Sequence, residues 1–260
     1  MLHYEISGNG NKTLILLHGF MENNTIWNEM EKHLSNDFFL VKIDLPGHGK
    51  SEKYHEINTM DFMAEKVKEI ADFLQLEKIN IIGHSMGGYT ALAFAEKYPD
   101  NIESLTLFFS TTLADDQEKK NIRKRSIAII DENFDTFVKT SIPNLFSNTE
   151  RDILEGKIEL AKEIAKSTDK EGVKAAQLGM AERPDRTSVL ENLDAKILII
   201  AGKHDNAVKT ENLLNVIPDK TNIKTYVLDC GHNGHWEKPS ICAEIINTEL
   251  LHNLPKHLVF

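Results

Sequence analysis

The sequence contains little cysteine, no long hydrophobic run and no excess of positive charge. Only two cysteines, Cys230 and Cys242, occur in 260 residues, and they form neither a CxxC pair nor a zinc-binding pattern. The longest apolar runs, such as Ile197 to Ala201, are five residues long, whereas a membrane-spanning helix needs about 20. The first residues lack the charged and apolar regions of a secretory signal. We therefore expect neither a membrane partner nor export, and we predict a reducing, cytoplasmic location.

The net charge excludes a further class of partner. Thirty Lys and Arg residues stand against 40 Asp and Glu residues, which gives a formal charge of −10. Affinity for nucleic acid comes from clustered cations, so we expect no nucleic-acid partner. The basic cluster at residues 119–125 is preceded by acidic residues and is interpreted as a solvated helix face. The composition is that of a globular protein, which we expect to be a monomer or a homodimer.

Short apolar runs alternate with helical periodicity along most of the chain. Most of the runs are nearly continuous in Val, Ile, Leu and Phe, as in parallel strands that are buried on both faces. They are residues 13–18, 38–43, 79–82, 104–109, 196–201 and 223–228. Helices are expected at 60–74 with Asn58 or Thr59 as N-cap, at 86–97, and from Pro239 with Ile241, Ile245 and Ile246 inward. This alternation predicts an α/β protein with a mostly parallel central sheet and helices on both faces.

One stretch, residues 112–186, interrupts this alternation. It contains no convincing strand, and its apolar residues suggest three helical pieces: Ile122, Ile129 and Ile130; Phe134, Phe137 and Val138; and Leu154, Ile158, Leu160, Ala161 and Ile164. A stretch this long exceeds one crossover connection, and the strands resume at Lys196. We therefore predict a helical cap (112–186) inserted into one core formed by residues 1–111 and 187–260.

Residues 83–87, Gly-His-Ser-Met-Gly, match the G-x-S-x-G motif between a predicted strand and a predicted helix. A serine in such a strained turn projects its hydroxyl above the sheet, and the flanking glycines leave room for the neighbouring chain. The pentapeptide alone arises often by chance, but the strand–turn–helix setting makes an ordinary turn serine the weaker interpretation. We predict Ser85 to be a nucleophile.

Two backbone amides are candidate donors to an oxyanion. In an enzyme with such a turn, one donor is the N–H after the serine, and the other comes from a loop after an earlier strand. Residues 18–20, His-Gly-Phe, end the strand that begins near residue 13. We predict an oxyanion hole formed by the N–H groups of Phe20 and Met86, although His-Gly is also common in plain turns.

An acid and a base are expected after the serine in chain order. Asp205 follows a predicted buried strand, and the alternatives Asp115 and Asp116 follow an earlier one. His232 comes directly after the last predicted strand and a glycine that allows the loop to bend, with His235 as its competitor. We predict Asp205 as the acid and His232 as the base.

Five motifs in the correct order resemble the α/β-hydrolase fold family. Besides the serine turn and the segments of the acid and base, they include residues 18–20 and residues 44–51, Asp-Leu-Pro-Gly-His-Gly-Lys-Ser. The resemblance implies that residues 44–51 form a structural loop in which His48 is not catalytic. It also implies that the cap shapes an acyl or alcohol pocket, and that the enzyme uses no cofactor and no metal.

The family hosts esterases, C–C hydrolases, dehalogenases, lyases and receptors, so the fold alone does not define a function. A serine nucleophile argues against a dehalogenase, and the single glycine of residues 18–20 resembles enzymes for ordinary esters. We predict a serine hydrolase that cleaves small to medium carboxylic esters, with such an ester as its small-molecule partner. Residues 231–239, Gly-His-Asn-Gly-His-Trp-Glu-Lys-Pro, resemble a menaquinone-pathway lyase, 2-succinyl-6-hydroxy-2,4-cyclohexadiene-1-carboxylate synthase, which is the alternative. A ligand-sensing receptor is a further alternative.

The expected pocket differs between the esterase and the lyase. The lyase family carries an arginine directly after the glycines that follow the serine, at the position where this chain has Tyr89. A substrate with several carboxylates needs cations around it, whereas a neutral ester needs an apolar lining. We expect a mainly apolar pocket above the serine that no cluster of cap arginines faces. The residues expected to line it, with packing as the alternative for the histidines, are His18, His84, Tyr89 and His235.

Overall fold

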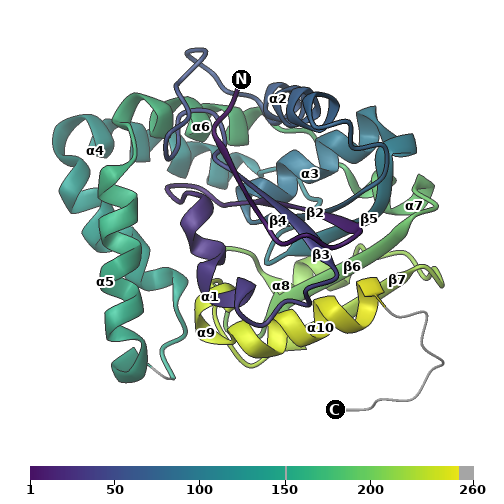
Figure 1. Cartoon of the computed structure of the whole chain (residues 1–260). Coiled ribbons are helices and arrows are strands. Elements are labelled where there is room, and N and C mark those ends of the chain that lie inside the picture. The colour runs from purple at the N-terminus through teal and green to yellow at the C-terminus, as the bar shows by residue number, and fades with distance from the viewer. Residues whose placement is uncertain (150, 252–260) are drawn as a thin grey trace.

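The structure, a computed structural model, describes residues 1–149 and 151–251 of the chain. Within these residues a seven-stranded sheet runs through the centre of the molecule in the order β1-β3-β2-β4-β5-β6-β7 (Figure 1). The strands are β1 (Tyr4–Ser7), β2 (Lys12–Leu17), β3 (Phe38–Ile43), β4 (Ile79–His84), β5 (Ile102–Phe108), β6 (Lys196–Gly202) and β7 (Ile223–Leu228). All neighbouring strands are parallel except β1, which pairs antiparallel with β3.

The predicted strands are confirmed, and one strand was missed. Strands β2 to β5 carry the near-continuous burial expected of a sheet covered on both faces. Strand β1 is short, lies at the sheet edge and has no fully buried residue. An exposed edge strand needs no continuous apolar run, and residues 4–7 contain none by which the strand could have been predicted. Its antiparallel pairing, with Tyr4 opposite Ile43, makes the sheet mixed rather than purely parallel.

Helices cover both faces of the sheet and form two separate cores. One core packs α2 (Met60–Phe73) and α3 (Met86–Lys97) on one face, together with α7 (Thr187–Asn192) and α8 (Thr210–Leu214). The other core joins the opposite face to η1 (Asn24–Trp27), α1 (Asn28–Glu31), α9 (Gly234–Glu237) and α10 (Pro239–Leu251). The helices on both faces and the mostly parallel sheet confirm the predicted α/β class (Figure 1).

Helix ends follow local sequence signals. Thr59 is the N-cap of α2, where its hydroxyl accepts the N–H of Phe62 at 3.2 Å, which selects Thr59 over Asn58. Helix α10 begins at Pro239, as predicted. The prediction that Ile241 points inward is wrong, because its side chain is 45% exposed on the outer side of α10.

The segment between β5 and α7 consists of helices above the carboxyl edge of the sheet. It contains α4 (Gln117–Ser141), η3 (Ile142–Leu145), α5 (Arg151–Ser167) and α6 (Lys170–Glu182), and no strand among its described residues. A short 3-10 turn, η2 (Pro99–Asn101), precedes β5. Helix α4 is kinked at Asn133, which has φ −156° and ψ 88°. The two helical pieces predicted on either side of residue 133 are therefore two helices that meet at this kink and together carry the label α4.

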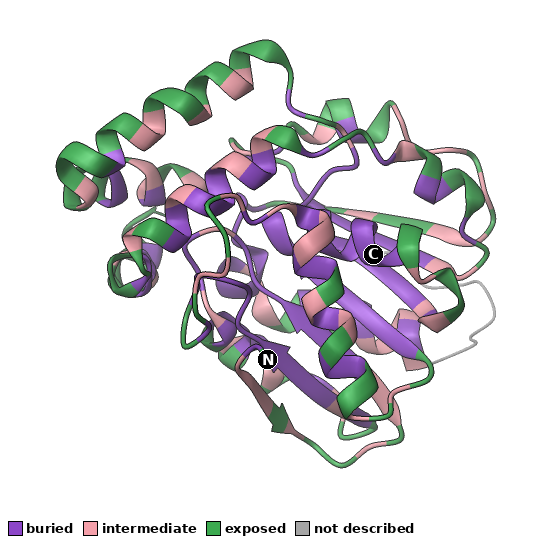
Figure 2. Ribbon diagram, turned by 90° about the horizontal axis from the view of Figure 1, so that it is seen from above, coloured by how far each residue is buried: buried purple, intermediate pink, exposed green. Residues whose placement is uncertain are grey.

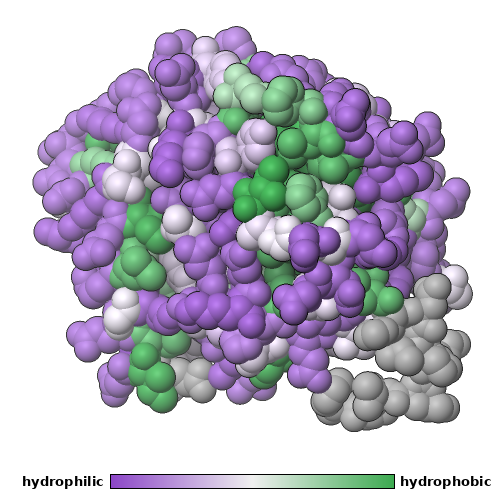
Figure 3. Space-filling model, viewed as in Figure 1, coloured by the Kyte–Doolittle hydropathy of each residue, from purple (hydrophilic) through white to green (hydrophobic). Residues whose placement is uncertain are grey.

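The cap is much more exposed than the core. Figure 2 shows α4 and α5 largely in exposed colours, and hydrophilic side chains predominate over them in Figure 3. Only Ile130, Phe137 and Val138 of the 25 residues of α4 are buried. Ile122, Ile129 and Leu160, three of the apolar residues that suggested the cap helices, are 46%, 45% and 41% exposed.

No helix in the described part of the chain is both long enough and apolar enough to span a bilayer.

Candidate active site

Ser85 occupies a strained turn between β4 and α3. Its backbone has φ 50° and ψ −112°, a conformation that a non-glycine residue rarely adopts, and its N–H donates to the Phe108 carbonyl at 3.1 Å. A Cβ on Gly83 would overlap the carbonyl of Gly87, so the turn closes only with glycine there. The motif found in the sequence therefore corresponds to a turn that holds the serine at the carboxyl edge of the sheet.

Backbone strain is concentrated at this edge. Four non-glycine residues among those described have positive φ, and three of them are Met21, Ser85 and Phe109, at 58°, 50° and 49°. They follow β2, β4 and β5, the three strands next to one another at the centre of the sheet. The hydroxyl of Ser110 donates to the Ser85 carbonyl at 2.7 Å, which helps to hold the turn. Strain that gathers in this way marks a functional site.

His232 and Asp205 form a buried pair at the same edge. Nδ1 of His232 lies 2.7 Å from Oδ2 of Asp205. The other carboxylate oxygen accepts the N–H groups of Ala207 and Val208, each at 2.8 Å, which fixes the carboxylate in its loop. The predicted acid and base are therefore brought together.

The pair shifts both pKa values. Burial opposes a charged His232, but the charge and hydrogen bond of Asp205 outweigh it and raise the pKa of the imidazole above 6.5. Burial also works against an ionised Asp205, whose pKa is nevertheless lowered below 3.8 by His232 and by the two backbone N–H groups. The alternative acid Asp115 makes no contact with this pair, because its carboxylate is held by two arginines.

A cavity of about 870 Å³ lies between the sheet edge and the cap. Ser85, His232 and Phe20 line it together with residues of α4 and α6. Gly19 lies against the nucleophile: a Cβ at Gly19 would lie 3.2 Å from the Ser85 Cβ. The loop after β2, which carries Phe20, is therefore adjacent to Ser85, and Met86 is the first residue of α3, where no helical carbonyl accepts its N–H.

The residues predicted to line the pocket divide into two groups. His84 and Tyr89 line the cavity, whereas His18 and His235 are not among its lining residues. His18 is fully buried, with Nε2 accepting the Leu45 N–H at 2.9 Å, so it braces the loop of residues 44–51. His235 is also fully buried in the cluster described next. The expected pocket role of these two histidines is therefore wrong, and both pack in the interior instead.

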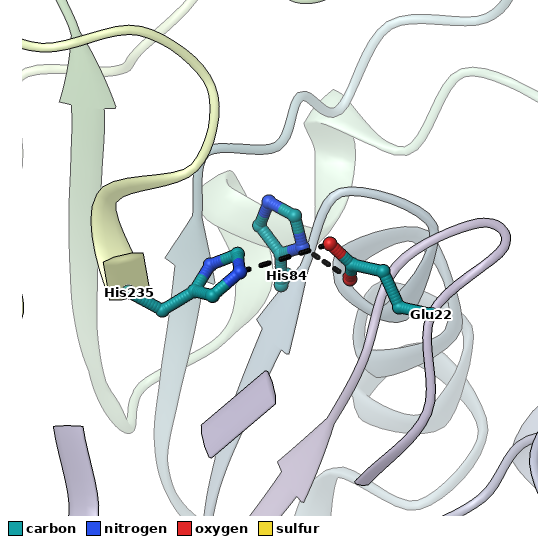
Figure 4. Close-up of side chains that lie close together, drawn as sticks. All are labelled: Glu22, His84 and His235. Carbon is teal, nitrogen blue, oxygen red and sulfur yellow. Dashed lines mark hydrogen bonds and ion pairs between the residues drawn. The ribbon is translucent and has the colours of Figure 1, made fainter. Parts of the chain in front are cut away.

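Sequence reasoning missed Glu22, a buried carboxylate that lines the same cavity as Ser85. Glu22, His84 and His235 come from three separate elements and offer ligand atoms within 4.8 Å of one another (Figure 4). A metal with bonds of about 2.0 Å in tetrahedral geometry holds its ligand atoms about 3.3 Å apart. Nδ1 of His84 and Oε2 of Glu22 are only 2.7 Å apart, which is a hydrogen bond rather than the spacing of two ligands. No signal in the local sequence distinguishes Glu22 from the surface acids of a loop.

Two cap arginines line the cavity, contrary to the expectation from the sequence. Arg123 and Arg183 both bind Asp115, and the Arg183 guanidinium lies 3.9 Å from the ring centroid of Tyr89. Burial works against an ionised Asp115, but the arginines lower its pKa below 3.8. Arg123 also donates to Gln177 at 2.9 Å. The trio carries one net positive charge, so the cavity is less apolar than predicted.

The cap is hydrogen-bonded directly to the loop that carries His232. The His232 N–H donates to the Leu145 carbonyl of η3 at 2.8 Å. Glu237 accepts the N–H groups of Gly231 and Ser147 at 2.9 and 3.1 Å, and so joins the base loop to the chain that follows η3. This position of the cap therefore fixes the backbone of His232.

Comparisons with known proteins agree with this architecture. A model of the alpha/beta hydrolase fold family matches residues 12–239, so the chain belongs to that family. A solved esterase from Thermogutta terrifontis, with malate bound, is 31% identical and superposes with a TM-score of 0.91 over 96% of this chain and 93% of the esterase.

Two curated relatives carry other activities. A putative 2-succinyl-6-hydroxy-2,4-cyclohexadiene-1-carboxylate synthase of Bacillus subtilis is 28% identical over 92% of this chain and 90% of the relative. A 2-hydroxy-6-oxononadienedioate/2-hydroxy-6-oxononatrienedioate hydrolase of Pseudomonas putida is 25% identical over 96% of this chain and 92% of the relative. The family and the resemblance stated from the motifs are confirmed, and the relatives include hydrolases and a synthase.

Proposed function

We propose that the protein is a serine hydrolase that cleaves small to medium carboxylic esters through an acyl-enzyme on Ser85. The observation that carries the proposal is the 2.7 Å bond between Nδ1 of His232 and Oδ2 of Asp205, beside the cavity that also contains Ser85. A histidine oriented by a carboxylate next to a serine in a strained turn is the arrangement that activates a hydroxyl for attack on a carbonyl.

The proposed reaction has two halves. His232 takes the proton of the Ser85 hydroxyl through Nε2 as the oxygen attacks the ester carbonyl, and then gives that proton to the departing alcohol. Asp205 holds the ring orientation and stabilises the imidazolium. The N–H groups of Phe20 and Met86 donate hydrogen bonds to the developing oxyanion, each typically worth about 10²–10³ in rate. Water then repeats the sequence on the acyl-enzyme and frees the acid.

The esterase proposal is supported by two further observations. The Thermogutta terrifontis esterase has this fold at 31% identity over nearly the whole chain. In the cavity, Asp115 pairs with both Arg123 and Arg183, so the three groups leave one net positive charge rather than the several cations that a substrate with several carboxylates needs. The cavity volume of about 870 Å³ suits esters of small to medium size.

The test combines labelling with a substrate series. A fluorophosphonate should form one adduct on Ser85, and aryl esters of graded acyl length should be turned over with an optimum at short or medium chains. Peptide mass spectrometry that locates the adduct on another serine would contradict the proposed nucleophile. Absence of turnover for every ester, with Ser85 still labelled, would contradict the substrate class.

A second candidate is the pyruvate-eliminating lyase, in which the same residues act as a base without an acyl intermediate. Arg123 and Arg183 in the cavity favour a substrate that carries carboxylates, and the Bacillus subtilis synthase is 28% identical. The cap guanidinium of Arg183 lies over Tyr89, the position where the lyase family has its own arginine. Turnover of the synthase substrate with release of pyruvate, faster than turnover of any aryl ester, would place the lyase first.

A further inference from the structure

Glu22 and His84 form a buried pair (Figure 4) that lines the same cavity as Ser85, and the proposed reaction does not use it. Nδ1 of His84 lies 2.7 Å from Oε2 of Glu22, and Nε2 of the same ring lies 3.1 Å from the His232 carbonyl oxygen. The same Oε2 accepts the Gly19 N–H at 2.6 Å. The pair therefore joins the loop after β2, the end of β4 and the backbone of the catalytic base.

Both partners of the His84 ring are hydrogen-bond acceptors. A carboxylate and a backbone carbonyl have no proton to donate, so each ring nitrogen must donate if both contacts are hydrogen bonds. A neutral imidazole has a single N–H and would leave one nitrogen lone pair facing an oxygen. With Glu22 ionised, as its pKa of about 2 indicates, the two distances together require a proton on Nδ1 and another on Nε2.

We propose that Glu22 and His84 form a buried ion pair, with His84 doubly protonated, that positions the oxyanion loop and the catalytic histidine. Glu22 holds the Gly19 amide and thereby the direction of the next N–H, that of Phe20. His84 holds the carbonyl of His232. Both are positioning residues, because they act through Gly19 and His232, and the kinetic part of the proposal rests on the proposed hydrolase function.

The charges around the pair are consistent with one cationic ring. Burial would raise the pKa of Glu22, but the charge and hydrogen bond of His84 lower it to about 2. Burial and the neighbouring His84 hold the pKa of His235 well below its ordinary value, so this ring is neutral. The titratable groups that face the pair are His18, His232 and His235. His232 has its own carboxylate in Asp205, so Glu22 is left to balance His84.

Protonation of His84 is tested on the full chain labelled with ¹⁵N in histidine only. At pH 8 the ring-nitrogen spectrum of the wild type should contain a histidine with both nitrogens protonated, and this pattern should be absent from His84→Gln. Glu22→Gln should remove the proton from Nδ1, because the negative charge that retains it is gone. A wild-type His84 ring with a single protonated nitrogen would overturn the proposal, whatever reaction the enzyme catalyses.

Kinetics test the positioning role. Glu22→Gln keeps an oxygen acceptor for Gly19 but loses the charge. A displacement of about 1 Å at a catalytic group costs up to about 10²-fold, so we expect kcat to fall about 10- to 100-fold with KM nearly unchanged. His84→Gln should act similarly, and the double variant should lose no more than the worse single variant, because the pair acts as a unit. Additive losses, or a change in KM alone, would contradict the positioning role.

Ser104→Ala is the matched control. The Ser104 hydroxyl donates to Asn80 at 2.6 Å in a buried contact at the opposite end of β4 and β5. This variant should lower the thermal midpoint and leave kcat unchanged. A Glu22→Gln variant with the kcat of Ser104→Ala would overturn the proposal. A wild type that neither hydrolyses esters nor reacts with fluorophosphonate would instead refute the hydrolase function, and the NMR result would still decide the ion pair.

Discussion

The carboxyl edge of the sheet and the cap above it hold their charged groups in different ways. At the sheet edge, Asp205 binds His232 and two backbone N–H groups, and Asp205 itself follows β6, a strand that is buried almost throughout. In the cap, Asp115 is shared between Arg123 and Arg183, and the helix that carries Arg123 is exposed over most of its length. The edge holds its carboxylate through backbone N–H groups, whereas the cap holds its carboxylate through the side chains of two arginines.

This difference suggests a division of roles, in which the sheet edge governs the chemical step and the cap governs substrate preference. A backbone-held carboxylate loses its orientation only if the strand ends move, so substitutions there should act on the chemical step. A guanidinium on a long side chain can take other partners, so substitutions in the cap should act on substrate preference. The following expectations test that division, beginning with the largest effect.

The largest effect is expected at Ser85. Ser85→Ala removes the nucleophile, and ester turnover should fall by about 10⁴–10⁶, because only the oxyanion donors and binding remain. The measurement is kcat with a short-chain aryl ester, together with loss of fluorophosphonate labelling. An Ala variant that turns over at the wild-type rate would show that the sheet edge does not carry the chemistry.

The next effect is expected at the acid and the base. His232→Ala should approach the loss of Ser85→Ala and should not add to it, since the two act together. Asp205→Asn should cost about 10⁴ in kcat, because the amide cannot hold the productive tautomer. The buried His235, which does not line the cavity, serves as the control. His235→Asn should lower the free energy of unfolding and should reduce kcat far less than His232→Ala does. The reverse order of the two histidines would mean that the base is misassigned.

The pH profile should distinguish the edge from the cap. His232 must be neutral to accept a proton, so kcat/KM should fall as the pH drops through its raised pKa, above 6.5. The raised pKa also means that the charged pair stabilises the fold fully below pH 6.5, and that this contribution is lost as pH rises through the folded-state pKa. Asp205→Asn removes the group that raises the pKa, so the acid limb should move to lower pH. An unmoved limb would assign it to another group.

The smallest effect is expected in the cap. Arg183→Met removes the cation over Tyr89 and leaves Asp115 with Arg123 alone, so KM and acyl-chain preference should change by about tenfold, the size of one cation–π or polar contact. The kcat for the best ester should stay within about threefold of the wild-type value, since the chemical step lies at the sheet edge. The exposed Arg125 on the same cap is the control, and Arg125→Met should change neither constant. A large loss of kcat in Arg183→Met would break the division between edge and cap.

Local patterns predicted most of the sheet and the loops that bring His232 and Asp205 together. The strands were visible because burial on both faces demands continuous apolar residues, and the serine turn because only glycine fits beside it. His232 and Asp205 could be placed because each follows a strand whose carboxyl end lies at the common edge.

Features that depend on distant partners could not be predicted. Strand β1 owes its existence to pairing with β3 and has no apolar pattern of its own. Glu22 becomes special only because His84, 62 residues later, lies 2.7 Å away. The arginines of the cavity were misjudged because the side on which a helix faces the core depends on its rotation, and α4 places Arg123 against Asp115 and Gln177 in the cavity. The cytoplasmic location and the oligomeric state stay predictions.

The hydrogen bond from the His232 amide to the Leu145 carbonyl couples solvent exchange in the core to detachment of the cap. An amide exchanges its hydrogen only when its hydrogen bond opens. The rate of deuterium uptake at residue 232 therefore reports how often η3 separates from the loop that carries His232. The Ser147 amide, which donates to Glu237, should exchange with the same opening free energy, because both bonds break in one event. A cap motion that admits substrate and leaves η3 in place must therefore bend the cap at another position. The non-helical residue Asn133 within α4 offers such a hinge.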